Sequence, residues 1–238
     1  MIICDCIQGD ARWHMLHIGI PTASRFSDIL QPKKLKPSAS QDKYLDTLIG
    51  EWLLGRRIQT QESDWMQRGK ELEPEAVAWY ELERGVDAEV VGFITRDDGM
   101  VGCSPDRLLG TDGLLEVKNP KIETHLGYLR DPDLLRDEYI AQVQGQLLVC
   151  ERAWCDLLSF SPRPDVPPVV VHVERDEKFL DALSKAVDAF VARLLEARAA
   201  LLARGAKPSP IGHQDAPRSL GKAMEEAGVT DAEAQAWV

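Results

Sequence analysis

Residues 104–120 read SPDRLLGTDGLLEVKNP, two largely apolar stretches separated by the turn signal at 110–113. Glycine and aspartate in such a turn favour a tight hairpin, so the segment predicts two antiparallel strands. A hairpin can bring Asp106 and Glu116 to one side of the sheet. The period-two alternation of a strand then places Glu116 and Lys118 on the same face. Leucine and valine flank Glu116, so the segment predicts three charged groups in an otherwise apolar setting.

Two carboxylates and a lysine in this arrangement suit phosphodiester hydrolysis. Asp106 and Glu116 provide the hard oxygen ligands that Mg²⁺ prefers. Lys118, partly buried beside a cation, could orient the attacking water or, with a depressed pKa, accept its proton. Charges within an apolar strand need a partner or a metal, which favours a buried site. The alternative is an exposed glutamate and lysine on an edge strand, because the E-x-K spacing alone is a weak signal.

The hydrophobic periodicity on either side of the hairpin predicts an α/β fold with a mixed central sheet flanked by helices. The expected helices are 23–30 (capped by Thr22 or Ser24), 40–55 (capped by Ser40 and closed by Gly55), 62–84 (with a kink or junction at Glu73, before Pro74), 133–151 and 176–204. The expected strands are 89–95, 100–109, 114–118, 154–160 and 169–173, of which the first three form a β-meander. We expect a single domain over residues 1–204 and a C-terminal tail over 205–238, loosely ordered or with a short helix near 219–227.

The composition is that of an ordinary globular chain of 238 residues. No apolar run reaches the length of a membrane span, and the N-terminus lacks a signal-peptide pattern, so we expect a cytosolic protein. The five cysteines are odd in number and lack C-x-x-C spacing. This pattern argues against a disulfide framework and against a zinc site, and indicates free thiols.

The formal net charge of -11 is unfavourable for contact with DNA, itself a polyanion. Binding depends on the local field, however, and the basic residues of this chain are clustered. Each cluster fits a solvated loop as well as a DNA contact. The clusters are Lys33, Lys34 and Lys36; Arg56 and Arg57; and Arg68 and Lys70.

The segment Ser104-Pro105-Asp106, followed by a hairpin and then by Glu116-Val117-Lys118, resembles the motif of the PD-(D/E)xK nuclease superfamily. Within that superfamily the chain resembles the lambda exonuclease family of viral alkaline exonucleases, also called YqaJ-like, over roughly residues 9 to 200. The order and spacing of several separate blocks carry this resemblance. The blocks are Gly9-Asp10 with Trp13-His14, Thr22 to Ser24, Gly69-Lys70 with Glu73, Cys103 to Asp106, Glu116 to Lys118 before Pro120, Tyr139 to Gln144, and Glu174 to Lys178.

The resemblance implies a restriction-endonuclease-like core and a role for each matching residue. Asp106, Glu116 and the backbone carbonyl of Val117 would bind the metals, and the helix residue Glu73 would help to hold a second one. Pro74 departs from the residue that usually follows that glutamate, and without the family Glu73 competes with Glu71 and Glu75. Lys118 would position or activate water, and Gln142 would join the site. Taken without the family, Gln142 is an ordinary polar helix residue.

Members of the family bind the 5′-terminal phosphate with an arginine and small hydroxyl residues. The hydroxyls match Ser24 and Ser104, whereas His17 stands at the arginine's position. A neutral histidine donates one hydrogen bond and carries no charge, so its phosphate affinity is lower than that of an arginine clamp. Arg25 could supply the missing charge. Without the resemblance, His17 is equally well explained as a surface residue of a short helix.

The resemblance further implies a Mg²⁺-dependent 5′→3′ exonuclease, with Mn²⁺ as a possible substitute, that acts on duplex DNA ends and leaves a 3′ single-stranded overhang. It implies a ring-shaped homotrimer, a single-strand annealing protein as partner in phage-type recombination, and action in the host bacterial cytosol. The alternatives are a superfamily endonuclease, a RecB-like nuclease domain, or a catalytically silent DNA-binding module.

Overall fold

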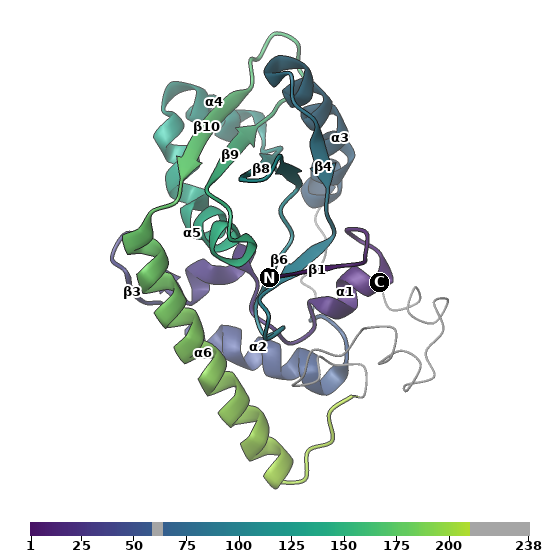
Figure 1. Ribbon diagram of the computed structural model, residues 1–238, viewed down its shortest axis with the longest axis vertical. Coiled ribbons are helices and arrows are strands. Elements are labelled where there is room, and N and C mark those ends of the chain that lie inside the picture. Colours follow the sequence, from purple (N-terminus) through teal and green to yellow (C-terminus); the bar gives the residue numbers. More distant parts are fainter. Residues whose placement is uncertain (59–63, 210–238) are drawn as a thin grey trace.

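The hairpin of residues 104–118 lies inside a five-stranded sheet in the computed structural model, which describes residues 1–58 and 64–209 (Figure 1). The strands lie in the order β10 (Val169–Glu174), β9 (Trp154–Ser159), β8 (Gly113–Lys118), β7 (Arg107–Leu109) and β4 (Ala88–Val90). Strands β8 and β9 are parallel, and the other neighbours are antiparallel. The expected mixed sheet is therefore confirmed.

The three segments of the β-meander expected over 89–118 pair antiparallel in chain order, but the first two segments each break between two sheets. β5 (Phe93–Thr95) and β6 (Gly102–Cys103) leave the main sheet and join β1 (Ile2–Cys4) in a three-stranded sheet. The first break is at Gly92, where an added Cβ would lie 2.0 Å from the Cys6 carbonyl oxygen. The second contains Pro105, which has no N–H to donate to a sheet.

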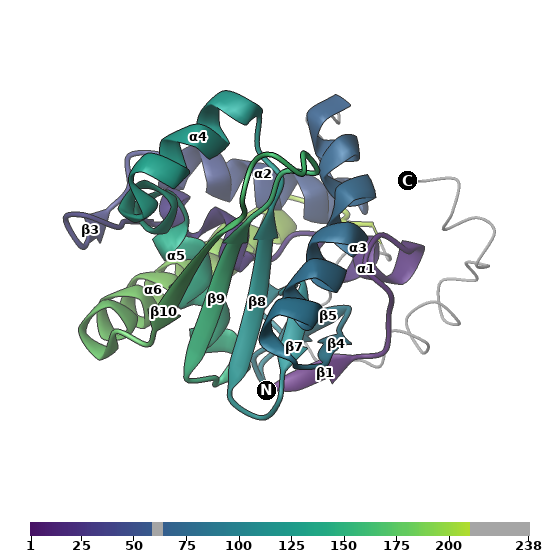
Figure 2. The same cartoon turned by 90° about the horizontal axis from the view of Figure 1, so that it is seen from above.

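Helices cover both faces of the main sheet (Figure 2). α3 (Asp64–Arg84) packs on one face, in a cluster that includes Tyr80 and the β8 residues Leu115 and Val117. α5 (Pro132–Cys150) and α6 (Glu177–Ala203) pack on the other, in a cluster that contains Leu114. Alternation along β8 therefore directs its even-numbered residues toward α5, as the sequence predicts for Glu116 and Lys118.

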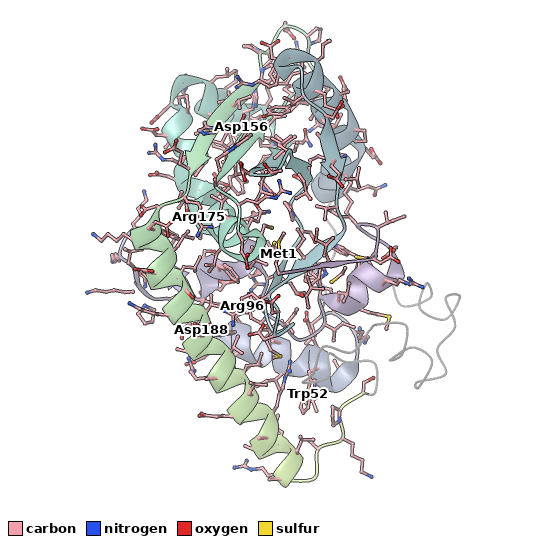
Figure 3. All side chains as sticks on the ribbon, viewed as in Figure 1. Met1, Trp52, Arg96, Asp156, Arg175 and Asp188 are labelled. Carbon is pink, nitrogen blue, oxygen red and sulfur yellow. The ribbon has the colours of Figure 1, made fainter. Side chains whose placement is uncertain are left out.

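Polar contacts fix the outer elements to this core. The Tyr80 hydroxyl donates to the buried Asp156 carboxylate at 2.6 Å and so ties α3 to β9. Arg96, beyond the end of β5, contacts Asp188 of α6 at 2.6 Å; Figure 3 labels both residues, with Asp156 on β9. The first contact also fixes the helix that carries Glu73.

The predicted helices correspond to elements of the structure, with local differences. α2 (Gln41–Leu54) is confirmed and ends at Gly55 with φ 67°, but the side chain of Ser40 does not cap it. The helix expected at 23–30 is the shorter 3₁₀ helix η1 (Ala23–Asp28), and the side chain of Thr22 makes no capping bond. α3 continues through Pro74 as one helix, so the expected junction at Glu73 is wrong. An interior proline removes one backbone hydrogen bond and crowds the carbonyl four residues earlier, but packing of the residues that follow, such as Val77 and Tyr80, retains the helix.

Several short elements were not expected from the sequence. They are α4 (Ile122–Arg130) and the hairpin of β2 (Leu30–Gln31) and β3 (Lys36–Pro37). The short helix considered at His17 is α1 (Ala11–Leu16), which has His17 as its C-cap. The predicted helix near 219–227, most of the predicted tail and the first residues of the helix expected at 62–84 lie outside the described residues. No helix in the described part of the chain has both the length and the apolar character needed to span a membrane.

Gly145 allows α5 to approach η1 closely. An added Cβ at this position would lie 2.4 Å from Cδ2 of Phe26, whose ring is completely buried. We expect Gly145→Ala to lower the free energy of unfolding by about 1–3 kcal/mol, because the ring has no free volume into which to move. Urea unfolding followed by circular dichroism measures the change.

The matched control is Gly127→Ala in α4, where an added Cβ meets nothing within 4 Å. Removing a helical glycine at an open position should raise stability by roughly 0.5–1 kcal/mol. Equal stabilisation by both substitutions would contradict the close approach of α5 to η1.

Candidate active site

The carboxylate of Glu116 is the centre of a buried polar cluster between β8 and α5. Its side chain is 4% exposed. Oε1 accepts hydrogen bonds from Lys118 Nζ at 2.6 Å and from Gln142 Nε2 at 2.5 Å, and Oε2 accepts one from Gln146 Nε2 at 2.6 Å. Gln142 and Gln146 are four residues apart on α5, so one face of that helix presents both amides. The structure thus brings together Glu116, Lys118 and Gln142, which the sequence singled out.

Lys118 is held on three sides. Its Nζ lies 3.2 Å from Gln142 Oε1 and 4.5 Å from the centre of the Tyr139 ring, in addition to its bond with Glu116. Burial acts to lower the pKa of Lys118, but attraction to Glu116 and Asp106 outweighs it, and the net pKa is raised. In the protein alone this raised pKa keeps Lys118 a protonated hydrogen-bond donor. A depressed pKa beside a bound cation stays a prediction.

Asp106 lies beside this cluster, as the hairpin predicted. Its Oδ2 accepts a hydrogen bond from the Val117 backbone N–H at 2.6 Å. The pKa of Asp106 is raised well above its ordinary value, mainly by burial and then by repulsion from Glu116 and Glu73. Repulsion among these carboxylates indicates a local excess of negative charge that a cation would relieve.

Glu73 reaches the same region from α3, on the opposite face of the sheet. Its Oε1 accepts a hydrogen bond from Arg107 Nη1 at 2.8 Å. The same nitrogen donates to the backbone carbonyl of Asp106 at 2.5 Å. Arg107 was not singled out from the sequence. The sequence signal that could have identified Arg107 was its position directly after the motif aspartate, at the start of a strand.

The donors around Asp106 fit a divalent metal chemically. Within residues 1–58 and 64–209, no three His, Cys, Asp or Glu side chains form a ready-made metal-binding group. Asp106, Glu116 and Glu73 nevertheless supply hard oxygen atoms, and the pKa of Asp106 is raised by burial and then by repulsion from the other two carboxylates. Asp106 and Glu116 would hold such an ion, with the carbonyl of Val117 as the further ligand that we predict.

Two more polar residues, Gln146 and Asn119, lie around the site and were not predicted from the sequence. Gln146 donates to Glu116, and Asn119 Nδ2 donates to the Gly69 carbonyl at 3.0 Å, which joins the end of β8 to α3. In the described part of the chain, Gln146 Oε1 and Asn119 Oδ1 are buried without a hydrogen-bond partner. The four-residue interval from Gln142 was a sequence signal for Gln146. No sequence signal pointed to the contact of Asn119 with Gly69, because the two residues are 50 apart in the chain.

The residues expected to bind a 5′ phosphate lie in neighbouring segments on the N-terminal side of the motif. Thr22 pairs with Gly102 in a parallel bridge, so the segments that contain Ser24 and Ser104 are neighbours. The Ser104 hydroxyl accepts a hydrogen bond from Trp13 Nε1 at 2.7 Å. Ser24 is exposed and lies 3.4 Å, Oγ to Oγ1, from Thr22.

Arg25 is partly engaged within its own segment. Its Nε contacts Asp28 Oδ2 at 2.5 Å, and its guanidinium lies 4.6 Å from the centre of the Tyr44 ring. The side chain remains 47% exposed, so a ligand in solution can reach it.

His17 is buried between two aromatic rings, and its interpretation as a surface residue is wrong. Its ring centroid lies 4.0 Å from that of Trp13 and 4.2 Å from that of Phe93. The Nδ1–H donates to the Trp13 carbonyl at 2.7 Å. Burial lowers the pKa of His17 to about 3, so the ring is neutral near pH 7 and contributes no charge toward a phosphate.

The buried neutral His17 should make the folded state sensitive to acid. Its pKa is about 3 when folded, against 6.5 when unfolded. Its contribution to stability is complete above pH 6.5 and is lost as the pH falls toward 3, because only the unfolded chain binds the proton. We expect His17→Phe to reduce the loss of unfolding free energy between pH 7 and pH 4 by a few kcal/mol, an order-of-magnitude value. Urea unfolding of both proteins at the two pH values measures it, and identical losses would refute the buried neutral histidine.

Comparisons with known proteins are consistent with this site. The family model described as the YqaJ-like viral recombinase domain matches residues 12–153. An alkaline exonuclease from Laribacter hongkongensis, LHK-Exo, is 33% identical, with a TM-score of 0.73 over 82% of this chain and 97% of that chain. The structure of LHK-Exo in complex with dAMP gives the same identity, TM-score and coverage. The comparison with curated proteins gave no match.

A phage-related exonuclease from Haemophilus somnus 129PT is 13% identical, with a TM-score of 0.57 over 82% of this chain and 96% of that chain, and shows likeness of fold alone. The family match spans more than half of the chain and includes Asp106, Glu116 and Lys118. Together with the LHK-Exo match, it identifies the architecture as restriction-endonuclease-like. The chain belongs to the YqaJ-like viral recombinase family, the lambda exonuclease family of nucleases.

Proposed function

We propose that the protein is a Mg²⁺-dependent exonuclease that degrades one strand of linear duplex DNA in the 5′→3′ direction and leaves a 3′ overhang. The observation that carries this proposal is the buried cluster of Glu116, Lys118 and Gln142 beside Asp106. Family membership supports exonuclease chemistry, and Mn²⁺ is a possible substitute for Mg²⁺ because it accepts the same oxygen ligands.

The chemistry follows from the charges in the cluster. Asp106, Glu116 and the Val117 carbonyl would hold a divalent ion, which would supply positive charge to the transition state and lower the pKa of a water molecule. Lys118, as an ammonium, donates hydrogen bonds that orient the attacking water and stabilise charge on the phosphate. Gln142 fixes Nζ of Lys118 and Oε1 of Glu116 together, so this donor is positioned before substrate binds.

The 5′→3′ polarity depends on recognition of a terminal phosphate. We assign this role to Ser104, Ser24 and Arg25, with Arg25 supplying the charge that neutral His17 lacks. Arg25 is half-exposed and adjoins Ser24, which supports the assignment. LHK-Exo was crystallised with dAMP, a nucleotide with a single phosphate, and an enzyme that releases mononucleotides must accommodate such a group.

We further propose a ring-shaped homotrimer with DNA in its central channel, working with a single-strand annealing protein in phage-type recombination in the host cytosol. The net charge of -11 supports enclosure, since a negatively charged protein has little net attraction for DNA. The exposed Lys33, Lys34 and Lys36 at the β2–β3 turn would face the channel. A ring can hold DNA through few basic contacts because it prevents dissociation.

Removal of Lys118 tests the chemistry. With Mg²⁺ and end-labelled linear duplex, we expect Lys118→Ala to slow digestion by about 10²- to 10⁴-fold, the usual contribution of such a group. Lys185→Ala, on the exposed side of α6, should digest at the parent rate, and a chelator should abolish digestion by the parent. A thermal melt shows that each variant is folded.

Digestion of duplexes that differ in label position and in their ends tests the direction of degradation. A label at the 5′ end should be released first, circular duplex should remain intact, and 5′-phosphorylated duplex should be digested faster than 5′-hydroxyl duplex. Cleavage of the circle would establish an endonuclease. Equal rates on the two linear duplexes would exclude a working phosphate pocket, and a Lys118→Ala protein as active as the parent would overturn the mechanism.

A further inference from the structure

The ion pair between Arg107 and Glu73 borders the proposed metal site. The side chains are 14% and 24% exposed, so solvent screens this pair less than a surface pair. Arg107 Nη1 binds both the Glu73 carboxylate and the backbone carbonyl of Asp106. Arg107 thus connects α3 to the motif aspartate, Asp106.

The pairing of charges leaves one carboxylate without a cationic side chain. Lys118 Nζ contacts Glu116, and Arg107 contacts Glu73. In the described residues, the hydrogen bond at the Asp106 carboxylate comes from the Val117 backbone. Counted as fully ionised, the three carboxylates and two cationic side chains leave a formal charge of -1, which a single divalent ion more than neutralises.

Two-metal nucleases place their ions about 3.5–4 Å apart, and each ion requires carboxylate oxygens on its own side. Here Oε1 of Glu73 is already occupied by a guanidinium. Arginine remains charged at every working pH, so this cation is permanent. A second ion at Glu73 would have to displace Arg107 or lie against its positive charge.

We propose that Arg107 takes the place of a second metal ion at Glu73, so that each chain binds one divalent ion, at Asp106 and Glu116. This inference rests on the metal dependence in the proposed function and deepens it. Arg107 acts as a positioning residue, because it neutralises the charge of Glu73 and holds α3 against the motif. The single ion and Lys118 stabilise the charge on the phosphate.

The number of Mn²⁺ ions bound per chain tests the inference directly, without reference to activity. Titration of the full chain with Mn²⁺, followed by electron paramagnetic resonance of the free ion, should give one ion per chain for the parent. Arg107→Ala frees Glu73 and removes a positive charge, so it should bind two. Arg107→Lys retains the charge and should bind one. Arg163→Ala removes a surface arginine paired with Asp165 at 2.8 Å and should also bind one.

The remaining outcomes each decide the matter. Two ions in the parent, or one ion of unchanged affinity in Arg107→Ala, would overturn the inference. If Arg107→Ala does not fold, as judged by circular dichroism, Glu73→Gln in the parent background takes its place. That variant should still bind one ion, and loss of the ion would overturn the inference. A parent that binds no Mn²⁺ would refute metal dependence itself, and with it the proposed function, whereas two ions would refute only the role of Arg107.

Discussion

The buried charge of Glu116 is the constraint on which the site depends. An ionised carboxylate in an apolar interior costs several kcal/mol unless hydrogen bonds and an opposite charge compensate it. Lys118, Gln142 and Gln146 provide that compensation. The requirement fixes two elements at once. β8 must present every second residue to α5, and α5 must present two amides one turn apart.

The same arrangement leaves negative charge in the site that a cation can neutralise. Burial and then repulsion from Glu116 and Glu73 raise the pKa of Asp106, and no cationic side chain in the described residues forms an ion pair with its carboxylate. A protein optimised for stability alone would avoid such a cluster, so the strain is consistent with a site built to bind a cation. The Tyr80–Asp156 bond and the pair of Arg107 with Glu73 keep α3 in place against this repulsion.

The sequence predicted the parts of the structure that depend on local periodicity. The β7–β8 hairpin, the shared face of Glu116 and Lys118, and the long helices follow from patterns within a few residues. The break at Gly92 does not, because it depends on close approach of Cys6 from a distant part of the chain. Similarly, the pKa directions of Lys118 and His17 depend on burial and on neighbours that only the folded chain brings together.

We propose that β8 and Asp106, the residue before β7, form the binding site of a catalytic metal ion. Crystals grown with Mn²⁺ and measured at a wavelength where manganese scatters anomalously test it most directly. The account predicts an anomalous peak within coordination distance of the Asp106 and Glu116 carboxylates, about 2.0–2.3 Å for a hard divalent ion. A peak elsewhere on the molecule, or none at these two carboxylates at saturating Mn²⁺, would contradict it.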